Sequence, residues 1–476
     1  MFLLYNNKKV SRSLKSIKIM AEKIQRQRAK EQDKFERRHN FESVESNFTD
    51  EQAQLEASRC LNCKNARCKQ GCPVNIDIPA FIQEIKENNL QKAGDIIRKD
   101  SMLPSVCGRV CPQEKQCEGN CILGIKGEPV SIGALERYVG DNTNAKSVQI
   151  VPNGKKVAIV GSGCAGMSAA ADLRNAGFEV SIFEALHEYG GVLRYGIPPF
   201  RLPRTVLDRE IKALQDMSVK FFKNVIVGKS ITIKQLQKEG YEAIFICSGA
   251  GLPKMMNIEG ENLNGVYSAN EFLTRVNLMH AQSPDTPTPL KVGKTTAIIG
   301  GGNVAMDAAR TAVRVGYEKV YIFYRRTEKE LPARLEEIRH AKEEGVDFQF
   351  LHAPVEIIGE DGWVKAMKFE IMELGEPDAS GRQKPVGTGK FVEVELDSVI
   401  VSLGTGPNPI IQRSAANEEL DLETDNKGYI VINEKGETSV NQIYAGGDVA
   451  PLGPSTAINA MGAGKRAAKA IIEALS

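Results

Sequence analysis

A strand, a glycine-rich turn, a helix and a second strand follow one another twice in this chain. The first copy is KKVAIVGSGCAGMSAAADLRNAGFEVSIFEA, and the pattern returns about 140 residues later as KTTAIIGGGNVAMDAARTAVRVGYEKVYIFYRR. Such βαβ units form parallel sheets with helices on their faces, and each binds a dinucleotide at its glycine turn. YEAIFICSGA between the copies and DSVIVSLGTGPN after them read as further buried strands. The chain is therefore expected to be an α/β protein with two Rossmann-like dinucleotide-binding domains.

The first glycine turn has every part of a dinucleotide site. Gly161 permits the tight turn, Gly163 lets a pyrophosphate approach the backbone, and Gly166 allows the helix to pack closely on the sheet. The helix N-terminus offers N–H groups and partial positive charge to the anion. Glu184 closes the second strand 18 residues after Gly166, where a carboxylate accepts hydrogen bonds from ribose hydroxyls. Cys164, inside the turn, reads as a small packing residue.

The second turn differs at the place where the ribose binds. Its expected nucleotide contacts are Gly300, Gly302, Asn303 and Val304. Where the first copy has a carboxylate stands Tyr324, followed by Arg325 and Arg326. Two guanidinium groups in place of a carboxylate favour a 2′-phosphate over a free hydroxyl. This unit is therefore expected to bind NADP(H), with a surface arginine pair as the alternative.

The last segment of the chain indicates that the first unit binds FAD. In YAGGDVA, Gly447 and Asp448 end a buried strand, and the Asp448 carboxylate can bind the ribityl chain of a flavin. A helix that begins near Thr456 can direct its N-terminus at the isoalloxazine ring. Paired Rossmann units with a late GGD motif resemble the glutathione-reductase-like flavoproteins. The redox C-x-x-C of disulfide reductases is missing, because these domains hold only Cys164 and Cys247.

The other eight of the ten cysteines precede the flavin unit, in CLNCKNARCKQGCP and CGRVCPQEKQCEGNC. In two-cluster ferredoxins, three closely spaced cysteines bind one cluster, and the fourth, before proline, binds the other. On this logic Cys60, Cys63 and Cys68 hold one [4Fe–4S] cluster, and Cys72 belongs to a second. Zinc sites of four cysteines accept similar spacings and are the alternative. Iron–sulfur is favoured because a flavin without a thiol acceptor needs a one-electron outlet.

Charge and hydropathy exclude other classes of protein. The 62 basic and 60 acidic side chains leave a net charge of +2, so no overall positive field exists to bind nucleic acid. No uncharged apolar run reaches the ~18 residues of a membrane span. The start, MFLLYNNKKVSRSLKSIKIM, lacks the features of a secretory signal, and Met20 is a second candidate for the first residue. We expect a cytoplasmic enzyme without structural disulfides.

The 476 residues allow about three domains of ~150 residues. Residues 1–150 are expected to form an α-helical iron–sulfur domain with an N-terminal arm. An FAD-binding domain over 151–288 and 402–476 encloses an NADPH-binding domain over 289–401. KIQRQRAKEQDKFERRHNF, within the arm, reads as a solvated surface helix, with docking to a partner subunit as the alternative.

Joined in this order, the cysteine-rich module and the Rossmann units resemble the NADPH-dependent glutamate synthase small (beta) subunit family. That family includes the large subunit of NADH-dependent ferredoxin:NADP oxidoreductase and sulfide dehydrogenase, and its fold recurs in the first half of dihydropyrimidine dehydrogenase. The resemblance covers about residues 40–476. The stretches that carry it are CPVNIDIPAFI, CGRVCP, GEPVSIGALERY, GGVLRYGIPPFRLP and AGGDV with its helix.

The resemblance implies FAD, NADPH and two [4Fe–4S] clusters, with further ligands. Cys121 would complete the cluster of Cys60, Cys63 and Cys68, and the other cluster would take Cys72, Cys111, Cys117 and Glu136. Glu136 stands where the pyrimidine enzyme has a glutamine, and Cys107 is the alternative ligand. In the flavin domain, Gly191 and Val192 would lie along the cofactor, and Arg201 would reach it.

The resemblance also implies the activity, in which electrons pass between NADP(H), FAD and the clusters without an acid–base dyad. The long form of the second cysteine group, CGRVCPQEKQC, favours the ferredoxin:NADP oxidoreductase large subunit, whose partner is a small flavin and [2Fe–2S] subunit. Ferredoxin is a further candidate partner. The alternative is a glutamate synthase small subunit that feeds a large subunit making glutamate from glutamine and 2-oxoglutarate. A different class would be a two-electron flavin reductase or scaffold with a zinc-stabilised docking module.

Overall fold

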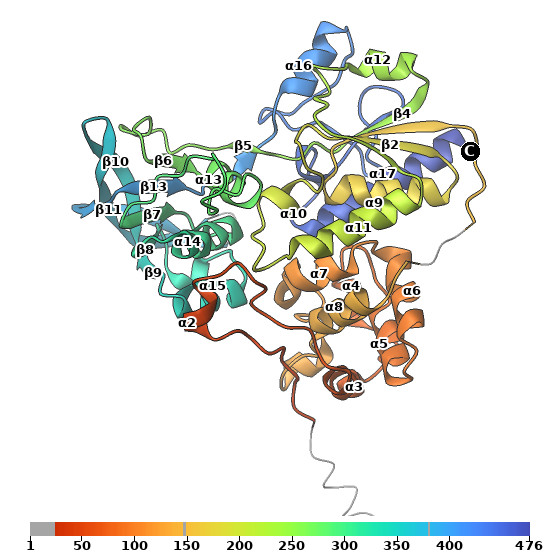
Figure 1. Cartoon of the computed structure of the whole chain (residues 1–476), viewed down its shortest axis with the longest axis horizontal. Coiled ribbons are helices and arrows are strands. Elements are labelled where there is room, and N and C mark those ends of the chain that lie inside the picture. The colour runs from red at the N-terminus through yellow and green to blue at the C-terminus, as the bar shows by residue number, and fades with distance from the viewer. Residues whose placement is uncertain (1–23, 146–148, 379–380) are drawn as a thin grey trace, which may run out of the picture.

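The computed structural model describes residues 24–145, 149–378 and 381–476, which form a helical unit and two sheet units (Figure 1). The helical unit lies beneath the first sheet unit, and the second sheet unit lies to one side of both. Met20 falls outside the described residues. Within the described part of the chain, no helix has the length and apolar character needed to cross a membrane.

The helical unit surrounds the two cysteine groups with short helices. They are α3 (Asp50–Arg59), α4 (Arg67–Gln70), α5 (Ile78–Lys86), α6 (Leu90–Asp100), α7 (Pro104–Val110) and α8 (Ile132–Asn142). α5 has a buried face of Ile78, Phe81, Ile82 and Ile85, because these positions recur at the helical period. Its stability therefore comes mainly from packing around the cysteines rather than from its own length.

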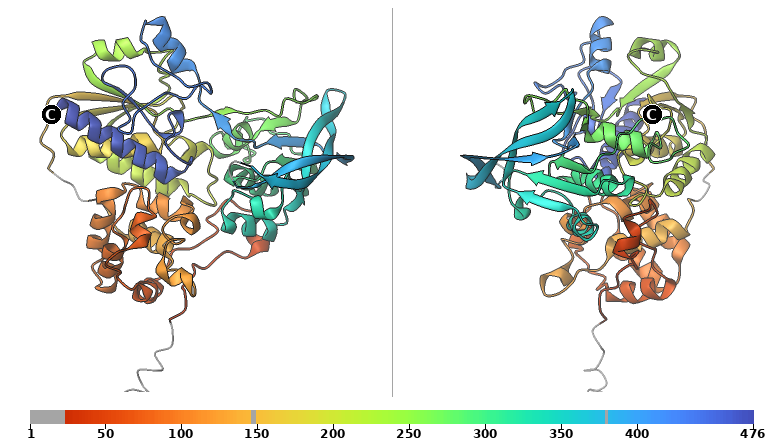
Figure 2. Two further views of the ribbon diagram at one scale, coloured as in Figure 1. Left: turned by 180° about the vertical axis from the view of Figure 1, so that it is seen from behind. Right: turned by 60° about the vertical axis from the view of Figure 1, so that its left-hand side comes forward.

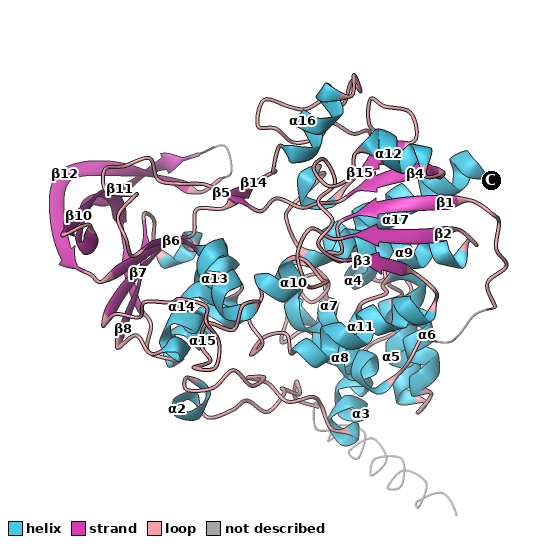
Figure 3. Cartoon of the chain, turned by 45° about the horizontal axis from the view of Figure 1, so that its top comes forward, coloured by secondary structure: helices cyan, strands magenta, loops and turns pink. Residues whose placement is uncertain are grey.

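The first sheet is parallel and has the strand order β15-β4-β1-β2-β3 (Figure 3). Its strands are β1 (Lys156–Val160), β2 (Glu179–Phe183), β3 (Lys220–Phe222), β4 (Tyr241–Ile246) and β15 (Ile443–Ala445). Helices α9 (Cys164–Asn175), α11 (Arg204–Asp216) and α17 (Ala457–Leu475) lie between this sheet and the helical unit (Figure 1). α12 (Ile233–Lys238) and α16 (Ile410–Asn417) lie on the opposite side. This is the expected Rossmann-like arrangement.

The second sheet is also parallel, in the order β6-β13-β7-β8-β9. Its elements are β6 (Val266–Ser268), α13 (Ala269–Asn277), β7 (Thr295–Ile299), α14 (Asn303–Val315), β8 (Lys319–Tyr324), α15 (Leu335–Glu343), β9 (Asp347–Phe350) and β13 (Ser398–Val401). β6 and α13 precede the expected boundary at residue 289, although β6 pairs with β13 of this sheet. The difference arises because β6 is short and no glycine turn marks it. We therefore propose a boundary before β6.

Two smaller β structures extend or connect the second unit. β10 (His352–Glu360), β11 (Trp363–Pro377) and β12 (Gln383–Glu395) form an antiparallel sheet that the sequence analysis did not predict. β5 (Leu252–Pro253) and β14 (Thr405–Gly406) pair as a two-stranded ribbon where the chain enters and leaves the second unit. The second sheet unit is therefore an insertion in the first.

The expected solvated helix of the N-terminal arm is wrong over most of its length. Residues 24–33 are not helical, and only α2 (Lys34–Arg37) is a helix. A backbone hydrogen bond from Gln32 N to Val44 O instead closes a hairpin. Arg37 is buried and forms ion pairs with carboxylates of the second sheet unit. The polar composition of the arm therefore reflects ion pairing rather than exposure to solvent.

Candidate cofactor-binding site

The glycine turn after β1 leaves open space above its backbone. Gly161 has φ +113°, and a Cβ there would lie 2.6 Å from Cys247 O, so only glycine fits. A Cβ on Gly166 would lie 2.1 Å from Gly161 O, which confirms the close approach of helix and strand. A Cβ on Gly163 meets nothing within 4 Å. No side chain caps the N-terminus of α9, so its N–H groups are available to an anion in that space.

Glu184 stands at the end of β2 beside this turn. Its buried carboxylate accepts hydrogen bonds from Ser162 N at 3.0 Å, from Ser162 Oγ at 2.5 Å and from Leu186 N at 2.9 Å. These donors fix the carboxylate against the turn. Ser162 was not singled out from the sequence. Its position between two glycines of the motif is the signal that could have identified it.

Gly191, Val192, Gly447 and Asp448 gather around the same turn. A Cβ on Gly191 would lie 3.1 Å from Gly163 Cα, so the segment of Gly191 and Val192 covers the turn. Gly447 and Asp448 form a short 3₁₀ helix, η4 (Gly447–Val449), against the start of α9. Burial raises the pKa of Asp448 above its usual range. Thr456 caps α17 by accepting a bond from Asn459 N.

Arg201 is the exception among the expected FAD residues. Its Nη1 lies 2.8 Å from both carboxylate oxygens of Asp307, and its Nε lies 2.9 Å from Glu337 Oε1. Both acidic residues belong to the second sheet unit, and the Arg201 side chain is only 6% exposed. The guanidinium therefore bridges two units, where the resemblance led us to expect a contact with the flavin.

The glycine turn after β7 has the geometry of the first turn. Gly300 has φ +142°, and a Cβ there would lie 2.4 Å from Ser402 O. A Cβ on Gly302 again meets nothing within 4 Å, and no side chain caps α14. Asn303 Oδ1 accepts a bond from Arg334 N, and Val304 is exposed beside it. The turn can therefore accept a second pyrophosphate.

The two arginines after β8 have different environments. Arg326 is buried, and it donates from Nε to Gln383 O at 2.7 Å and from Nη2 to Asp378 Oδ2 at 2.5 Å. Arg325 is exposed and has no hydrogen bond or ion pair with any other described residue. Only the Arg325 guanidinium is thus free to bind a phosphate, while Arg326 anchors the β11–β12 hairpin.

An outer cysteine site opens at the surface of the helical unit. Cys60, Cys63, Cys68 and Cys121 line one cavity, whose other walls include Ile78, Ile82, Leu123 and Val130. Cys60 ends α3, Cys68 lies on α4, and Cys121 precedes the 3₁₀ helix η2 (Ile122–Ile125). Burial, followed by the neighbouring thiols, raises the pKa of Cys68 to about 11. Four convergent thiols in an apolar wall are a donor set that fits an iron–sulfur cluster.

An inner cysteine site lies deeper, between the outer site and the first sheet unit. Cys111 and Cys117 are buried, and burial, followed by the nearby Glu136 carboxyl, raises the pKa of Cys72 to about 11. Burial alone raises the pKa of Glu136 to about 8, and its Oε1 has no hydrogen-bond partner among the described atoms. A buried, unpartnered carboxyl beside three thiols fits a fourth ligand, because a bound metal would satisfy it.

Cys107 is buried beside Cys111. The two thiols are within hydrogen-bonding distance, and Cys107 Sγ lies 3.4 Å from Met461 Sδ on α17. Cys107 is thus also close enough to remain the alternative ligand. All ten cysteines lie in the described residues, and none forms a disulfide.

Comparisons with known proteins match both parts of the chain. Residues 37–148 match the family described as dihydropyrimidine dehydrogenase domain II, 4Fe-4S cluster, and residues 155–464 match the pyridine nucleotide-disulphide oxidoreductases. The glutamate synthase [NADPH] small chain of Halomonas elongata is 36% identical over 92% of this chain and 94% of its own length. The NADP(+)-dependent formate dehydrogenase subunit beta of Moorella thermoacetica is 38% identical over 85% of this chain and 59% of its own length.

Solved structures show the same fold for the sheet units. Mycobacterium tuberculosis FprA in complex with NADPH has a TM-score of 0.55 at 23% identity, over 67% of this chain and 84% of that chain. Lactococcus lactis thioredoxin reductase has a TM-score of 0.51 at 21% identity, over 67% of this chain and 98% of that chain.

Proposed function

Because the chain belongs to the glutamate synthase [NADPH] small-chain family, we propose that it is the nucleotide-binding subunit of an electron-transfer complex whose partner docks at the outer cysteine site. The sequence-based predictions of an α/β fold behind an iron–sulfur domain, and of an NADPH-dependent oxidoreductase with FAD and two [4Fe–4S] clusters, are confirmed. The alternative of a zinc-stabilised docking module is set aside by the match to a 4Fe-4S family.

We infer that each glycine turn holds one of the two nucleotides. The turn at Gly163, with Glu184 and Asp448, would hold FAD, and the turn at Gly302, with Arg325, would hold NADPH. When bound, nicotinamide and flavin exchange a hydride, and the clusters carry single electrons. The chain itself orients each nucleotide by backbone N–H groups and keeps the inner ligands away from water.

The position of the outer site supports a protein acceptor. The inner site borders α17 of the first sheet unit, which we call the flavin unit, whereas the outer site reaches the surface. Around it Leu61, Ile122 and Ile125 are 60%, 46% and 63% exposed. Exposed apolar side chains gathered at one place commonly mark an interaction surface. These side chains lie beside the outer cysteine site, from which electrons would pass to an acceptor protein.

Charge at this rim favours a partner with an acidic face. Lys64, Arg67 and Lys126 are exposed there, and Glu128 is already paired with Arg28. An acidic electron carrier would be steered by these cations. We propose an electron-transfer subunit as this partner, either a small flavin and [2Fe–2S] subunit or a glutamate synthase large subunit, with ferredoxin as a further candidate. A cytoplasmic location stays a prediction.

The full-length relatives favour the glutamate synthase partner. The small chains from Halomonas elongata and Escherichia coli are each matched over 94% of their own length. The long second cysteine group keeps the ferredoxin:NADP oxidoreductase reading as the other candidate. The two candidates differ in the acceptor that restores NADPH oxidation, which can be measured directly.

The test reverses the charge of the rim in a Lys64→Glu, Arg67→Glu, Lys126→Glu triple variant. NADPH oxidation with ferredoxin, or with a glutamate synthase large chain plus glutamine and 2-oxoglutarate, should fall and lose its salt dependence. NADPH oxidation with a small dye should be unchanged. Lys342→Glu, which changes an exposed lysine of the second sheet unit, is the matched control. Equal losses with dye and protein acceptors would contradict a docking role.

A further inference from the structure

The N-terminal arm, residues 24–48, connects the helical unit with the second sheet unit. At its base Arg26 Nη2 donates to Glu118 Oε2 at 2.6 Å. Its hairpin is closed by the 2.8 Å bond from Gln32 N to Val44 O. The tip, α2, lies beside α15 in Figure 1 and again from behind in Figure 2. The arm therefore spans the space between two units.

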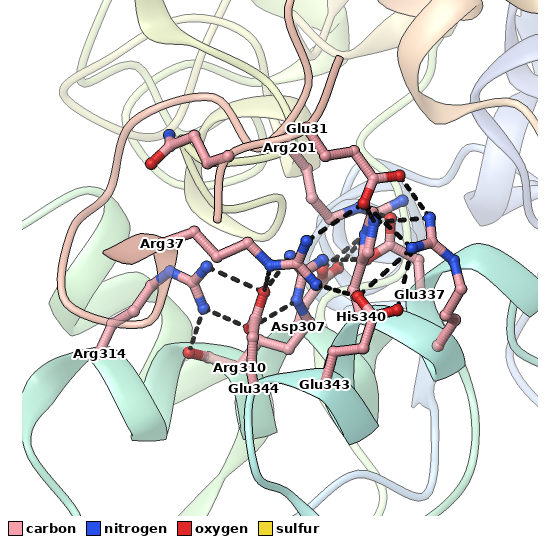
Figure 4. A network of polar contacts seen from close by, with 12 residues as sticks. Glu31, Arg37, Arg201, Asp307, Arg310, Arg314, Glu337, His340, Glu343 and Glu344 are labelled. Atoms are coloured by element: carbon pink, nitrogen blue, oxygen red, sulfur yellow. Dashed lines mark hydrogen bonds and ion pairs between the residues drawn. The ribbon is translucent and has the colours of Figure 1, made fainter. Parts of the chain in front are cut away.

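Arg37 at the tip binds carboxylates from both sides (Figure 4). Its Nη2 lies 2.6 Å from Glu343 Oε2, its Nε lies 3.0 Å from Glu344 Oε1, and its Nη1 lies 3.2 Å from Glu31 Oε2. The Arg37 side chain is 1% exposed. Glu31 in turn pairs with Arg339 on α15 at 2.5 Å. Charges this deeply buried persist only when they are neutralised in a fixed geometry, so the contact is specific.

Glu344 extends the network to α14 and the first sheet unit. It also binds Arg310 at 2.8 Å and Arg314 at 2.6 Å. The guanidinium carbons of these two arginines lie 4.6 and 3.9 Å from the ring centroid of Phe200, which belongs to the first sheet unit. Val44 N of the arm donates to Phe200 O at 3.0 Å. The arm, α14 and the first sheet unit thus meet at Phe200.

The next residue, Arg201, joins the same two sheet units through Asp307 and Glu337. Asp307 lies one helical turn after Asn303, where α14 begins at the glycine turn. The ion pair therefore ties the nucleotide-binding end of α14 to the segment that follows Gly191. This places the arm's network at the border between the two sheet units.

The covalent connection between the sheet units is slight. Within the described residues the chain crosses between them at β5 and β14, so non-covalent contacts set their relative orientation. Arg334 of the second sheet unit, which we call the NADPH unit, connects it to the helical unit. It donates hydrogen bonds to Arg109 O at 2.9 Å and to Gln113 Oε1 at 2.8 Å. The arm itself contacts all three units.

We propose that the arm is a clasp that holds the NADPH unit in register with the flavin unit, and that Arg37 is a positioning residue for hydride transfer. Removing the clasp would then slow flavin reduction without weakening nucleotide binding, because Arg37 contacts Glu31, Glu343 and Glu344 and not Gly302 or Arg325. The arm is thereby given an intramolecular role in place of the solvated surface that its composition suggests.

The experiment compares the full-length holoenzyme with Arg37→Gln, Arg37→Lys and Glu31→Gln variants. Lys342→Gln is the control, because Lys342 lies on α15 but pairs with exposed Glu328 of the same unit. Three properties are measured: hydrogen–deuterium exchange, the Kd for NADP⁺, and the stopped-flow rate of flavin reduction by saturating NADPH. Hydrogen–deuterium exchange is measured in protein without NADPH, so it shows whether the arm is released independently of turnover.

In Arg37→Gln, exchange should rise in the arm and around Phe200, and the rate of flavin reduction should fall about tenfold or more with the Kd unchanged. Arg37→Lys should recover part of the rate, and Lys342→Gln should match the wild type. Glu31→Gln, a milder change at a residue 27% exposed, covers the case in which Arg37→Gln fails to fold. Faster exchange with an unchanged or increased rate would overturn the proposal. A fall explained by a weaker Kd would do the same.

Discussion

Cys107 Sγ lies 3.4 Å from Met461 Sδ, across the border between the helical unit and the flavin unit. One residue later on α17, a Cβ on Gly462 would lie 3.6 Å from Pro73 O, next to Cys72. The inner cysteine site is therefore built directly against the last helix of the flavin unit. This proximity, rather than sequence spacing, gives the two cysteine sites their order along the molecule.

The first prediction concerns the ligands of the inner site. Cys107→Ala should keep about eight irons per chain, whereas Cys111→Ala should lose one cluster. Glu136→Ala should weaken the same cluster and leave the outer one intact, because the unpartnered Glu136 carboxyl faces the inner thiols. Iron analysis and EPR of anaerobically purified protein measure both effects. Loss of a cluster in Cys107→Ala, with none in Glu136→Ala, would move the ligand to Cys107.

The second prediction uses two glycines of one turn as a matched pair. Gly163→Ala should leave the melting temperature of the FAD-free protein unchanged, because the new Cβ meets no protein atom, yet it should weaken FAD binding. Gly166→Ala should destabilise the fold itself, by about 1–3 kcal/mol, because its Cβ collides with Gly161 O. Thermal unfolding and flavin content separate the two. Normal FAD content in Gly163→Ala would show that the pyrophosphate binds elsewhere.

The third prediction separates the two arginines after β8. Arg325→Ala should raise the KM for NADPH about ten- to a hundredfold and leave the KM for NADH nearly unchanged, because a charge-assisted bond to the 2′-phosphate is lost. Arg326→Ala should mainly lower stability, because it leaves Asp378 and the Gln383 carbonyl without this donor. Steady-state kinetics with both nucleotides and melting curves provide the measurements. A selective NADPH defect in Arg326→Ala alone would reverse the assignment.

The sequence predicted best where a motif is local. The two glycine turns, the strand that ends at Glu184 and the GGD segment lie where their spacing placed them, because each motif is one βαβ unit or a strand end. The outer site also contains Cys121, which the resemblance, not the spacing, added to Cys60, Cys63 and Cys68.

The sequence predicted least where distant segments pair. Arg201 binds Asp307, 106 residues away, and Arg37 binds Glu344, 307 residues away, and no local pattern encodes such partners. Composition therefore suggested a solvated arm, although Arg37 is buried. The antiparallel sheet was missed because β12 alternates weakly and is mostly exposed. We assign β6 to the second sheet unit because it pairs with β13, a partner that no hydrophobic period in a three-residue strand could indicate.

The final prediction concerns pH and the base of the arm. Partial burial, with Glu336 beside it, raises the pKa of Glu45 to about 8, although Arg137 and Arg334 act in the opposite direction. Glu31 and His340 lie near the same carboxylate. The ordinary pKa of such a group is 4.5, so between pH 4.5 and 8 the folded chain keeps a proton that the unfolded chain has released.

The contribution of Glu45 to the free energy of unfolding is therefore fully present below about pH 4.5 and is lost as the pH rises to about 8. Glu45→Gln removes the titration, because an amide stays neutral at every pH. Its melting temperature should exceed that of the wild type by more at pH 8.5 than at pH 5. Glu42→Gln, an exposed change in the same hairpin, is the control. Other buried carboxyls, such as Glu210, act alike in every variant, so the difference between the Glu45→Gln and Glu42→Gln curves isolates this one. Parallel curves for the two variants would mean that Glu45 is ionised in the folded protein at neutral pH and that the arginines outweigh its burial.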